Sequence, residues 1–501
     1  MGRAALLAID QGTTSSRALV FSPAGELIAS AQSEFPQHYP ANGWVEHDPE
    51  DIWQSVLRVI RSAMLDARAE GWEVQSAGIT NQRETVIVWE RSSGAAIYPA
   101  IVWQDRRTAA VCEALRAEGF EPELTEKTGL LLDPYFSASK IAWILDHVPG
   151  ARQRAAKGEL AAGTVDSFLI WRMNQGGRHQ TDATNASRTS LYDIRRGEYC
   201  DRLLAAFNVP RELLPSVHNC ADDYGQLHQD LFGKAIPLGG VAGDQQAATI
   251  GQGCTSPGTI KSTYGTGCFV LLNTGSQQVH SNQRLLSTIA YQLAGQPVYG
   301  LEGSIFVAGA AVQWLRDQLG VISHADQTEA LAAELDGNDG VYLVPAFTGL
   351  GAPHWDPEAR GSLLGMTRNT GRAHLARAAL ESVAYQTAGL LDAMGRDGQE
   401  GDLLRVDGGM VRNSWLCQFL ADVLDGPVER PELLESTALG AALLAGLAGG
   451  VYPGLTALSQ LERPQRRFEP RMTDSLRGEL LEGWRAALRR TRSHQGPQTA
   501  G

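Results

Sequence analysis

The chain contains 501 residues, of which 43% are hydrophobic and 20% are charged, and it carries a formal net charge of −13. Its length exceeds that of one ordinary hydrophobic core, so we expect two globular domains. The acidic balance argues against a nucleic-acid partner, which requires a basic face. The acidic net charge does not exclude a nucleotide as a ligand, because backbone amides and Mg²⁺ can bind phosphate locally.

The cysteines and two apolar segments bear on the compartment. The six cysteines form no Cys-x-x-Cys pair, which argues against a disulfide framework and a zinc site and favours the reducing cytoplasm. The run Ala4–Ile9 is short and ends at Asp10, so no signal peptide is evident. The uncharged stretch Ser436–Leu461 is interrupted by Gly449-Gly450 and Pro453-Gly454, which predicts a buried helix and a turn rather than a membrane span.

The first half of the chain alternates between strands and helices. A meander of three strands is predicted at Leu6–Ile9, Ala18–Phe21 and Glu26–Ser33. Asp48 as the N-cap and Pro49 as the first helical residue predict an amphipathic helix after it. Further strands and a helix are then predicted at Ala77–Thr80, Val86–Trp89, Ala100–Trp103 and, for the helix, Thr164–Met173.

The second half repeats this mixture. Strands are predicted at Thr259–Tyr264, Phe269–Leu272, Val341–Pro345 and Leu403–Val406. Helices are predicted at Phe306–Leu319, His374–Met394 and Ser414–Leu424. The pattern indicates an α/β duplication with domains at 1–250 and 251–501, and the seam is expected near residues 247–260, where glycines cluster.

Two glycine-bearing turns, one in each half, point to a nucleotide. Asp10-Gln11-Gly12-Thr13-Thr14 closes the first apolar run, and Thr263-Tyr264-Gly265-Thr266-Gly267 leads into another. Such turns expose backbone N–H groups and hydroxyls, which suits a polyphosphate held between two half-molecules. The alternative is that each turn only joins two strands. Beside the first turn, Asp10 could hold Mg²⁺ through water, while Thr13, Thr14, Ser15 and Arg17 could contact phosphoryl oxygens.

Four side chains suggest a site for a small polyol. Arg83 and Glu84 follow a strand, and together they can donate to hydroxyl oxygens and accept from hydroxyl protons. Trp103 and Tyr135 could form an aromatic wall for the CH face of the polyol. The alternatives are a surface salt bridge for the Arg-Glu pair and ordinary core positions for the aromatic residues.

Two further turns are candidates for chemistry. Asp244 follows an apolar run and Gly243, and its carboxylate could take the proton from an attacking hydroxyl. It could equally cap the helix that begins nearby, and the two roles can coexist. Asp407-Gly408-Gly409-Met410, with Asn413 beyond it, could lie flat against an adenine ring, or it could be an ordinary strand-to-helix turn.

Taken together, these segments resemble the glycerol kinases within the FGGY carbohydrate-kinase family of the actin-like ATPase superfamily. The resemblance runs from about Leu6 to Arg467. It rests on Ile9–Arg17, Gly43–Pro49, Ile79–Thr85, Ala100–Trp103, Asp133–Phe136, Thr181–Arg188, Ala242–Ala247, Ser262–Phe269, Val344–Pro357, Arg405–Gly409 and Ser436–Gly446.

The resemblance implies the fold and the roles of individual residues. The implied fold is two domains with ribonuclease-H-like cores that flank a deep cleft. The implied ligands are glycerol, ATP and Mg²⁺. The positions that match glycerol contacts are Arg83, Glu84, Trp103, Tyr135, Asp244, Gln245 and Phe269. Those that match nucleotide contacts are Thr13, Thr14, Ser15, Arg17, Thr266, Gly309, Gln313, Gly409 and Asn413. Asp10 and Asp244 match the carboxylates near Mg²⁺, and Asp244 matches the general base.

The resemblance also bears on regulation and on alternatives. Members of the family form homodimers or homotetramers. The segment Asp230–Pro237 is shorter than the loop that binds fructose bisphosphate in some members, and Asp230 stands where others carry a phosphorylated histidine. The alternatives are a kinase of a longer sugar, a chaperone-like ATPase that needs no polyol site, and a sensor of glycerol without activity.

Overall fold

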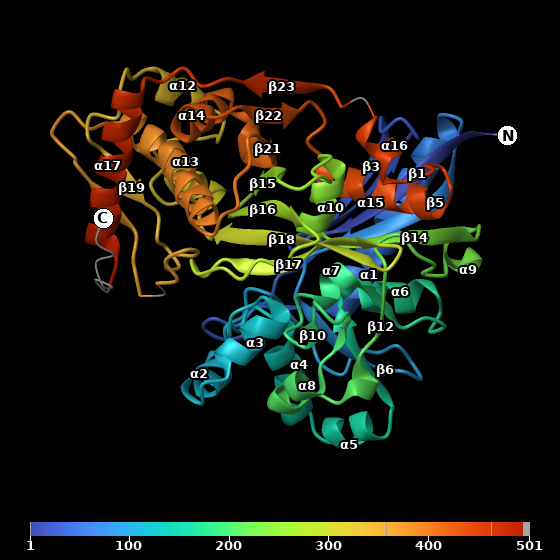
Figure 1. Cartoon of the computed structure of the whole chain (residues 1–501). Coiled ribbons are helices and arrows are strands. Elements are labelled where there is room, and N and C mark those ends of the chain that lie inside the picture. Colours follow the sequence, from blue (N-terminus) through green and yellow to red (C-terminus); the bar gives the residue numbers. More distant parts are fainter. Residues whose placement is uncertain (1, 357, 462, 494–501) are drawn as a thin grey trace.

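Two large mixed sheets, each covered by helices, form the frame of the molecule (Figure 1). The computed structural model describes residues 2–356, 358–461 and 463–493. The first sheet has the order β13-β14-β5-β1-β2-β3, with strands β1 (Arg3–Gln11), β2 (Ser15–Phe21), β3 (Leu27–Glu34), β5 (Trp72–Asn81), β13 (Gln226–Leu227) and β14 (Ile236–Gly243). The second has the order β17-β18-β16-β15-β21-β22-β23, with strands β15 (Ile260–Tyr264), β16 (Cys268–Gly275), β17 (Leu286–Leu293), β18 (Gln296–Ile305), β21 (Leu404–Asp407), β22 (Val428–Pro431) and β23 (Gln465–Phe468).

The two sheets share one pairing pattern. In the first, β1, β2 and β3 form an antiparallel meander, and β5 and β14 continue the sheet in parallel from β1. In the second, β15, β16 and β18 form the meander, and β21 and β22 continue it in parallel from β15. The repetition confirms the duplicated α/β pattern that the sequence predicts.

The first long helix shows why the sequence forms these elements where it does. α1 (Pro49–Ala69) begins after Asp48, whose side chain accepts a hydrogen bond from the amide of Glu50 at 2.8 Å. Its apolar stripe, which includes Val56 and Ile60, is buried against the first sheet. A cap and a stripe at helical spacing therefore placed this helix correctly from the sequence.

A smaller body is inserted into the first half and fills the lower part of Figure 1. Its four-stranded sheet has the order β4-β7-β6-β8, with strands β4 (Glu46–His47), β6 (Val86–Glu90), β7 (Ala100–Ile101) and β8 (Leu160–Thr164). Its helices are α2 (Ala109–Ala117), α3 (Glu121–Thr128), α4 (Ser137–His147), α5 (Ala151–Ala156), α6 (Val165–Met173), α7 (Ala183–Ala186) and α8 (Asp201–Phe207). Two short pairs join it, namely β9 (Gln180–Asp182) with β12 (Ser216–His218), and β10 (Tyr192–Asp193) with β11 (Glu198–Tyr199).

The remaining helices are α9 (Gln229–Phe232), α11 (Gly309–Asp317), α12 (Gln327–Ala333), α13 (Arg372–Arg396), α14 (Ser414–Leu424), α16 (Leu455–Ser459) and α17 (Asp474–Thr491), and a short strand pair, β19 (Tyr342–Val344) with β20 (Ser362–Leu364), lies beside α13 and α17. α9 lies between β13 and β14, and α16 packs against β1 and β2, so these two adjoin the first sheet, whereas the others belong to the second half. The helix predicted from Phe306 starts only at Gly309, because β18 continues to Ile305 and the chain then turns.

Two helices connect the sheets. α10 (Asp244–Gly251) leads from β14 to β15, and α15 (Ser436–Ala448) follows β22 but packs on β1, β5 and β14 of the first sheet. The two helices touch through backbone: a Cβ at Gly440 would lie 1.8 Å from the carbonyl oxygen of Ala247, and one at Gly251 would lie 1.9 Å from that of Ser436. The close contact requires glycine at both places. α15 belongs to the second half of the chain by sequence, yet it packs on the first sheet. The predicted boundary between two domains at residue 250 therefore stays a prediction.

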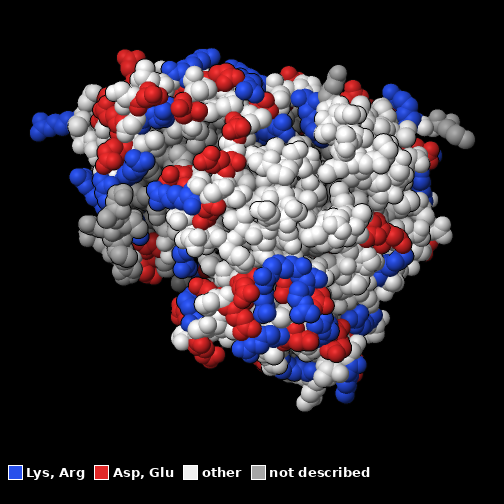
Figure 2. Space-filling model, in the orientation of Figure 1, with Lys and Arg blue, Asp and Glu red and all other residues white. Residues whose placement is uncertain are grey.

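The charge on the surface and the character of the helices bear on nucleic-acid and membrane partners. On the face in Figure 2, basic and acidic side chains interleave at the upper left and along the lower part, and a broad central area carries neither. The segment Ser436–Leu461 forms α15 and then a turn at residues 449–454, as predicted, and the short helix α16 after the turn was not predicted. None of the helices in the described ranges combines the length and the apolar character that a bilayer crossing requires.

Candidate active site

The ends of the parallel strands of the first sheet bring the predicted residues together. Asp10 on β1 lies opposite Thr80 on β5, and Gly243 on β14 lies opposite Asn81. Arg83 and Asp244 follow directly after β5 and β14. The carboxyl ends of parallel strands meet at one edge of a sheet, which is where ligands bind in such folds. Three segments far apart in the sequence thus contribute to one site.

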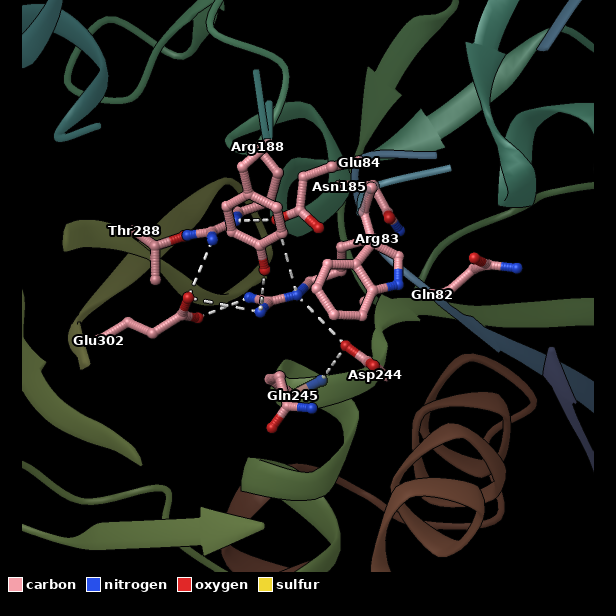
Figure 3. Close-up of polar contacts among 12 residues, drawn as sticks. Gln82, Arg83, Glu84, Asn185, Arg188, Asp244, Gln245, Thr288 and Glu302 are labelled. Atoms are coloured by element: carbon pink, nitrogen blue, oxygen red, sulfur yellow. Dashed lines mark hydrogen bonds and ion pairs between the residues drawn. The ribbon is translucent and has the colours of Figure 1, made fainter. Parts of the chain in front are cut away.

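Arg83 lies at the centre of a buried ion network (Figure 3). Its Nη1 donates to Glu302 Oε2 at 2.6 Å, and its Nε lies 3.2 Å from Asp244 Oδ1 and 3.9 Å from Glu84 Oε1. Arg188 completes the network, with Nε 2.6 Å from Glu84 and Nη2 2.8 Å from Glu302. The side chains of Arg83 and Glu84 are each 2% exposed, so the interpretation of this pair as a surface salt bridge is wrong.

The network balances its charges in surroundings that disfavour them. Burial alone would raise the pKa of Glu302, but Arg188 and Arg83 lower it to about 2. Burial raises the pKa of Glu84, and the same two arginines oppose that shift. Two guanidinium groups and two glutamates therefore hold one another in place, which fixes Arg83 and Glu84 before any ligand arrives.

Asp244 stands at the open side of this network. Its side chain is 34% exposed, and its Oδ1 accepts a hydrogen bond from the amide of Gln245 at 2.7 Å. Burial raises its pKa, while Arg83 and Lys261 oppose the shift. The amide of the preceding Gly243 donates to Thr184 Oγ1 at 2.9 Å, which anchors the turn. Asp244 is thus both the first residue of α10 and a carboxylate that faces the site.

The aromatic residues gather beside Arg83. The ring centroids of Trp103 and Tyr135 are 5.7 Å apart, and those of Trp103 and Phe269 are 6.3 Å apart. The guanidinium of Arg83 lies 5.8 Å from the Phe269 centroid. All three rings are partly exposed rather than fully buried in a core. They form one apolar surface with contributions from both halves of the chain.

On the first sheet, the residues predicted to contact phosphate are held in place by a backbone turn and by ion pairs. The amide of Gly12 donates to the carbonyl oxygen of Ser15 at 2.9 Å, which closes the turn that carries Thr13 and Thr14. Trp103 Nε1 donates to Thr13 Oγ1 at 3.0 Å and so joins this turn to the aromatic surface. Arg17 pairs with both Asp10 and Glu435, and the first of these raises its pKa most.

On the second sheet, the predicted nucleotide residues surround a cluster of glycine turns. The amide of Gly309 donates to the carbonyl oxygen of Gly265 at 3.0 Å, and that of Ala308 donates to Thr266 at 2.9 Å. Gly408 has φ 91°, and a Cβ there would lie 2.4 Å from the carbonyl oxygen of Tyr264. Gln313 lies on α11 beside this cluster, Gly409 follows Gly408, and Asn413 caps α14 through Leu416 N at 2.9 Å. Backbone, rather than charged side chains, shapes this part.

Comparison with known proteins places this geometry in a family. The N-terminal domain of the FGGY family of carbohydrate kinases matches residues 5–251, and the C-terminal domain of the same family matches residues 260–449. The chain belongs to the FGGY family of carbohydrate kinases. This membership confirms the family and the two-domain actin-like fold that the sequence predicts.

The relatives of this FGGY kinase cover its whole length. It is 61% identical over 491 residues to a glycerol kinase of Rhodospirillum centenum, covering 98% of this chain and 99% of that protein. It is 57% identical to glycerol kinase 1 of Pseudomonas aeruginosa, covering 97% and 99%. The crystal structure of Plasmodium falciparum glycerol kinase with ADP superposes with a TM-score of 0.91 at 35% identity, covering 98% of each chain.

Three buried charges of this FGGY kinase were not predicted from the sequence, namely Arg188, Glu302 and Lys261. Lys261 Nζ donates to Gln245 Oε1 and, at 3.1 Å, to Thr263 Oγ1. Burial lowers its pKa, and Asp407 and Asp244 oppose that shift. A lysine and a glutamate inside buried strands were the available signal, because such charges are seldom fully buried without a partner.

The carboxylates of the site suit a six-coordinate cation that a substrate also binds. The described residues contain no group of three or more His, Cys, Asp and Glu side chains that could enclose a metal by themselves. Mg²⁺, however, is commonly bound by one or two carboxylates together with substrate phosphates and water. Asp10 and Asp244 are close enough that the charge of Asp10 raises the pKa of Asp244. The donor set therefore suits Mg²⁺ that arrives with a nucleotide.

Proposed function

We propose that this chain transfers the γ-phosphoryl group of ATP to a primary hydroxyl of glycerol and so forms glycerol 3-phosphate. Identities of 57–61% over nearly the full length to proteins named glycerol kinase support the substrate. The structural observation that carries the proposal is the position of Asp244, 3.2 Å from the buried Arg83, whose guanidinium lies 5.8 Å from the ring centroid of Phe269. A small triol fits such surroundings, because it offers hydroxyls to the charges and CH groups to the rings.

In the proposed complex, Arg83 donates to hydroxyl oxygens of glycerol and Glu84 accepts from hydroxyl protons. Trp103, Tyr135 and Phe269 contact the carbon chain. Gln245 contributes an amide, which Lys261 holds through the side-chain oxygen. Because Arg83 and Glu84 are already fixed by Arg188 and Glu302, binding glycerol costs little side-chain ordering.

Asp244 is the proposed general base. The primary hydroxyl oxygen forms a bond to the γ-phosphorus, the bond from that phosphorus to the bridging oxygen breaks, and ADP leaves with the bond electrons. The hydroxyl proton passes to Asp244, the carboxylate that faces the site. The nucleophile and the leaving oxygen must lie in line with phosphorus, so positioning supplies most of the rate.

The phosphates lie between the two glycine turns in this proposal. The first turn and its flank contribute Thr13, Thr14, Ser15 and Arg17. The second lobe contributes Thr266, Gly309, Gln313, Gly409 and Asn413. Asp10 and Asp244 are the residues that would hold Mg²⁺, which supplies charge neutralisation on the phosphates when bound. Arg17 pairs with two carboxylates, and its guanidinium keeps N–H donors beyond the two that these pairs use.

Assembly and compartment belong to the same proposal. The resemblance supports a homodimer or a homotetramer, and the six free thiols support a reducing cytoplasm. Light scattering of the purified protein at assay concentration measures the oligomeric state. A fully active monomer would contradict the proposed homodimer or homotetramer.

A substrate panel tests the function. Purified protein is incubated with ATP, Mg²⁺ and one acceptor at a time, and ADP release is coupled to an optical signal. We expect kcat/KM for glycerol to exceed that for xylulose or gluconate by about 100-fold or more, since the site accommodates a three-carbon chain. Turnover of either longer substrate above that of glycerol would contradict the proposal, as would ATP hydrolysis that no acceptor stimulates.

A further inference from the structure

The short helix α7 lies between the two large sheets, beside the candidate active site. It packs on β14 of the first sheet and on β17 of the second, and it lies directly beneath the second sheet in Figure 1. Asp182, Thr184 and Asn185 at its start are fully buried, and the proposed complex assigns them no contact with glycerol or ATP. Buried polar side chains are costly unless they are hydrogen-bonded, so the partners of these three residues show what the cluster does.

Asp182 organises the cluster. Its Oδ2 accepts from the hydroxyl of Thr184 at 2.6 Å, from the amide of Thr184 at 2.8 Å and from the thiol of Cys220 at 3.3 Å. Its Oδ1 accepts from the amide and the side-chain nitrogen of Asn185, at 3.0 and 2.8 Å. Burial raises the pKa of Asp182, and the hydrogen bonds from Thr184 and Asn185 oppose that rise. With five donors around its two oxygens, the group acts as an acceptor and so fixes which atoms of Thr184 and Asn185 face it.

Thr184 reaches the turn that carries the proposed base. Because its hydroxyl proton points to Asp182, its oxygen is free to accept from the amide of Gly243, at 2.9 Å. Gly243 is the last residue of β14, and Asp244 follows it. A Cβ at Gly243 would lie 2.7 Å from Cδ of Arg83, so the same turn packs against the arginine that faces the base. The hydroxyl of Thr184 therefore fixes the backbone from which Asp244 projects.

Asn185 reaches the strand end that carries Arg83. Its side-chain nitrogen donates to Asn81 Oδ1 at 3.1 Å, and Asn81 Nδ2 donates back to Asn185 Oδ1 at 3.0 Å. Asn81 is fully buried, it is the last residue of β5, and it lies opposite Gly243 in the first sheet. Arg83 follows two residues later. Two neighbouring residues of α7 thus hold the ends of two neighbouring strands, and one carboxylate orients both of them.

We propose that Thr184 and Asn185 are positioning residues of the phosphoryl transfer, with Thr184 placing Asp244 and Asn185 placing Arg83, and that Asp182 orients both. The inference rests on the proposed function. The spacing between the base and the arginine that holds glycerol is then set from the inserted body, by groups that touch neither substrate. Such placement matters because a shift of about 1 Å in a reacting group can cost about 100-fold in rate.

Thr184→Val tests the link to the base, because it keeps the shape of the side chain and removes the hydroxyl. We expect kcat to fall at least tenfold while KM for glycerol and KM for ATP stay within about twofold. Thr184→Ser, which restores the hydroxyl, should return kcat to within about threefold of the wild type. If Thr184→Val does not fold, Thr184→Cys replaces it, since a thiol is a weak acceptor and should give a kcat below that of Thr184→Ser. Wild-type kcat without the hydroxyl, or an equal loss in Thr184→Ser, would overturn this link.

The matched control is Thr181→Val. Thr181 is also buried, but its hydroxyl donates to Asp166 at 2.6 Å and not to the cluster around Asp182. Kinetics are measured well below the melting temperatures of both variants, so that unfolded protein does not contribute. Thr181→Val should keep kcat and both KM values within about twofold, even where its melting temperature falls as far as that of Thr184→Val. An equal loss of kcat in the control would show that any buried hydroxyl matters, and would overturn the positioning role.

Asn185→Ala tests the link to the arginine. We expect KM for glycerol to rise about fivefold and kcat to stay within about threefold, because Arg83 loses a support while Gly243 keeps its bond to Thr184. Asn81→Ala should give the same rise, and the double variant should give no more than either single variant, since the two amides act as a pair. Additive effects, or a fall in kcat without a change in KM, would overturn this link.

Hydrogen exchange separates this inference from the proposed function, because it needs no turnover. Exchange of the Gly243 amide is followed by mass spectrometry of the peptide that spans β14 and the start of α10. Thr184→Val should speed this exchange at least tenfold, whereas Thr181→Val should leave it unchanged. Wild-type protection in Thr184→Val would overturn the inference even in an active enzyme. A wild-type protein that preferred another acceptor would instead contradict the proposed function, and the ratios of kcat and KM would then be measured with that acceptor.

Discussion

The two sides of the candidate active site are built by different means. The proposed glycerol side consists of charged side chains that neutralise one another in the interior, with Arg83, Arg188, Glu84 and Glu302 almost fully buried. The proposed nucleotide side consists of backbone at Gly265, Gly309 and Gly408, and its polar side chains are partly or fully exposed.

The difference teaches where each side is vulnerable. Removing one charge from a closed network leaves its partner buried and unpaired, which costs several kcal/mol and displaces the other members. Adding a single carbon to a glycine turn instead strains the backbone or blocks the ligand. We therefore expect the glycerol side to be damaged by loss of charge and the nucleotide side by added bulk.

The largest effect is expected from Asp244→Asn, which removes the proposed base and keeps the shape of the site. It should lower kcat about 10³-fold, within the range for general-base catalysis. Calorimetry should show that ADP affinity is kept within about twofold, since a nucleotide binds mainly to the glycine turns. A kcat near that of the wild type would exclude Asp244 as the base.

A pair of adjacent glycines separates fold from ligand on the nucleotide side. Gly408→Ala places a Cβ 2.4 Å from a backbone oxygen at positive φ, so we expect a loss of about 3 kcal/mol in unfolding free energy. At Gly409 an added Cβ meets nothing within 4 Å. Gly409→Ala should keep the melting temperature and raise KM for ATP about tenfold.

Denaturation curves and ATP kinetics of Gly408→Ala and Gly409→Ala together show which glycine serves the fold and which serves the ligand. If Gly409→Ala kept wild-type kinetics for ATP, the proposed adenine contact at this turn would be wrong. Equal stability of both variants would contradict the steric account.

On the glycerol side, Arg188→Lys tests a residue that contacts the network but was not predicted from the sequence. Lysine cannot reach Glu84 and Glu302 together, so Glu84 loses support. We expect a loss of about 2 kcal/mol in unfolding free energy and about a tenfold rise in KM for glycerol. The matched control is Arg178→Lys, whose partner Asp223 is exposed, and its effect should be near zero. Similar values for the two variants would show that burial does not decide the cost.

The effect on activity is expected to be smallest for the buried carboxyl of Asp166, which instead makes stability depend on pH. Burial, together with the charge of Asp182, raises the pKa of Asp166 to about 7, and Thr181 Oγ1 donates to it at 2.6 Å. At a pH between about 4, the ordinary pKa of an aspartate, and 7, Asp166 keeps its proton in the folded chain but has released it in the unfolded chain. Asp166 therefore lowers the free energy of unfolding by about 1 kcal/mol for each pH unit from about 4 to 7. Above pH 7 it lowers that free energy no further.

Asp166→Asn, which does not titrate, should remove that decline. Urea unfolding of both proteins from pH 5 to pH 8 measures it, and the variant should gain stability relative to the wild type as the pH rises to 7. Parallel curves for the two proteins would contradict the raised pKa.

The sequence and the structure differ most where charges are buried. The predicted strands, the first helix and the glycine turns followed from local patterns, because caps, periodicity and turn residues act within a few positions, whereas β17 and β18 of the second sheet were not predicted. The grouping of Asp244 with Arg83 was implied only by the family resemblance, and the structure brings the two together at the strand ends. Glu302 could not be placed in this way, since its partners lie 219 and 114 residues away in the chain. Only the tertiary fold brings such charges together.

The most direct test of the central claim is a crystal structure with glycerol and a non-hydrolysable ATP analogue. We predict a carboxylate oxygen of Asp244 within about 2.6–3.2 Å of a primary hydroxyl of glycerol, with that hydroxyl in line with the γ-phosphorus. Glycerol bound against the rings of Trp103 and Phe269 but with its hydroxyls out of reach of Asp244 would contradict the mechanism.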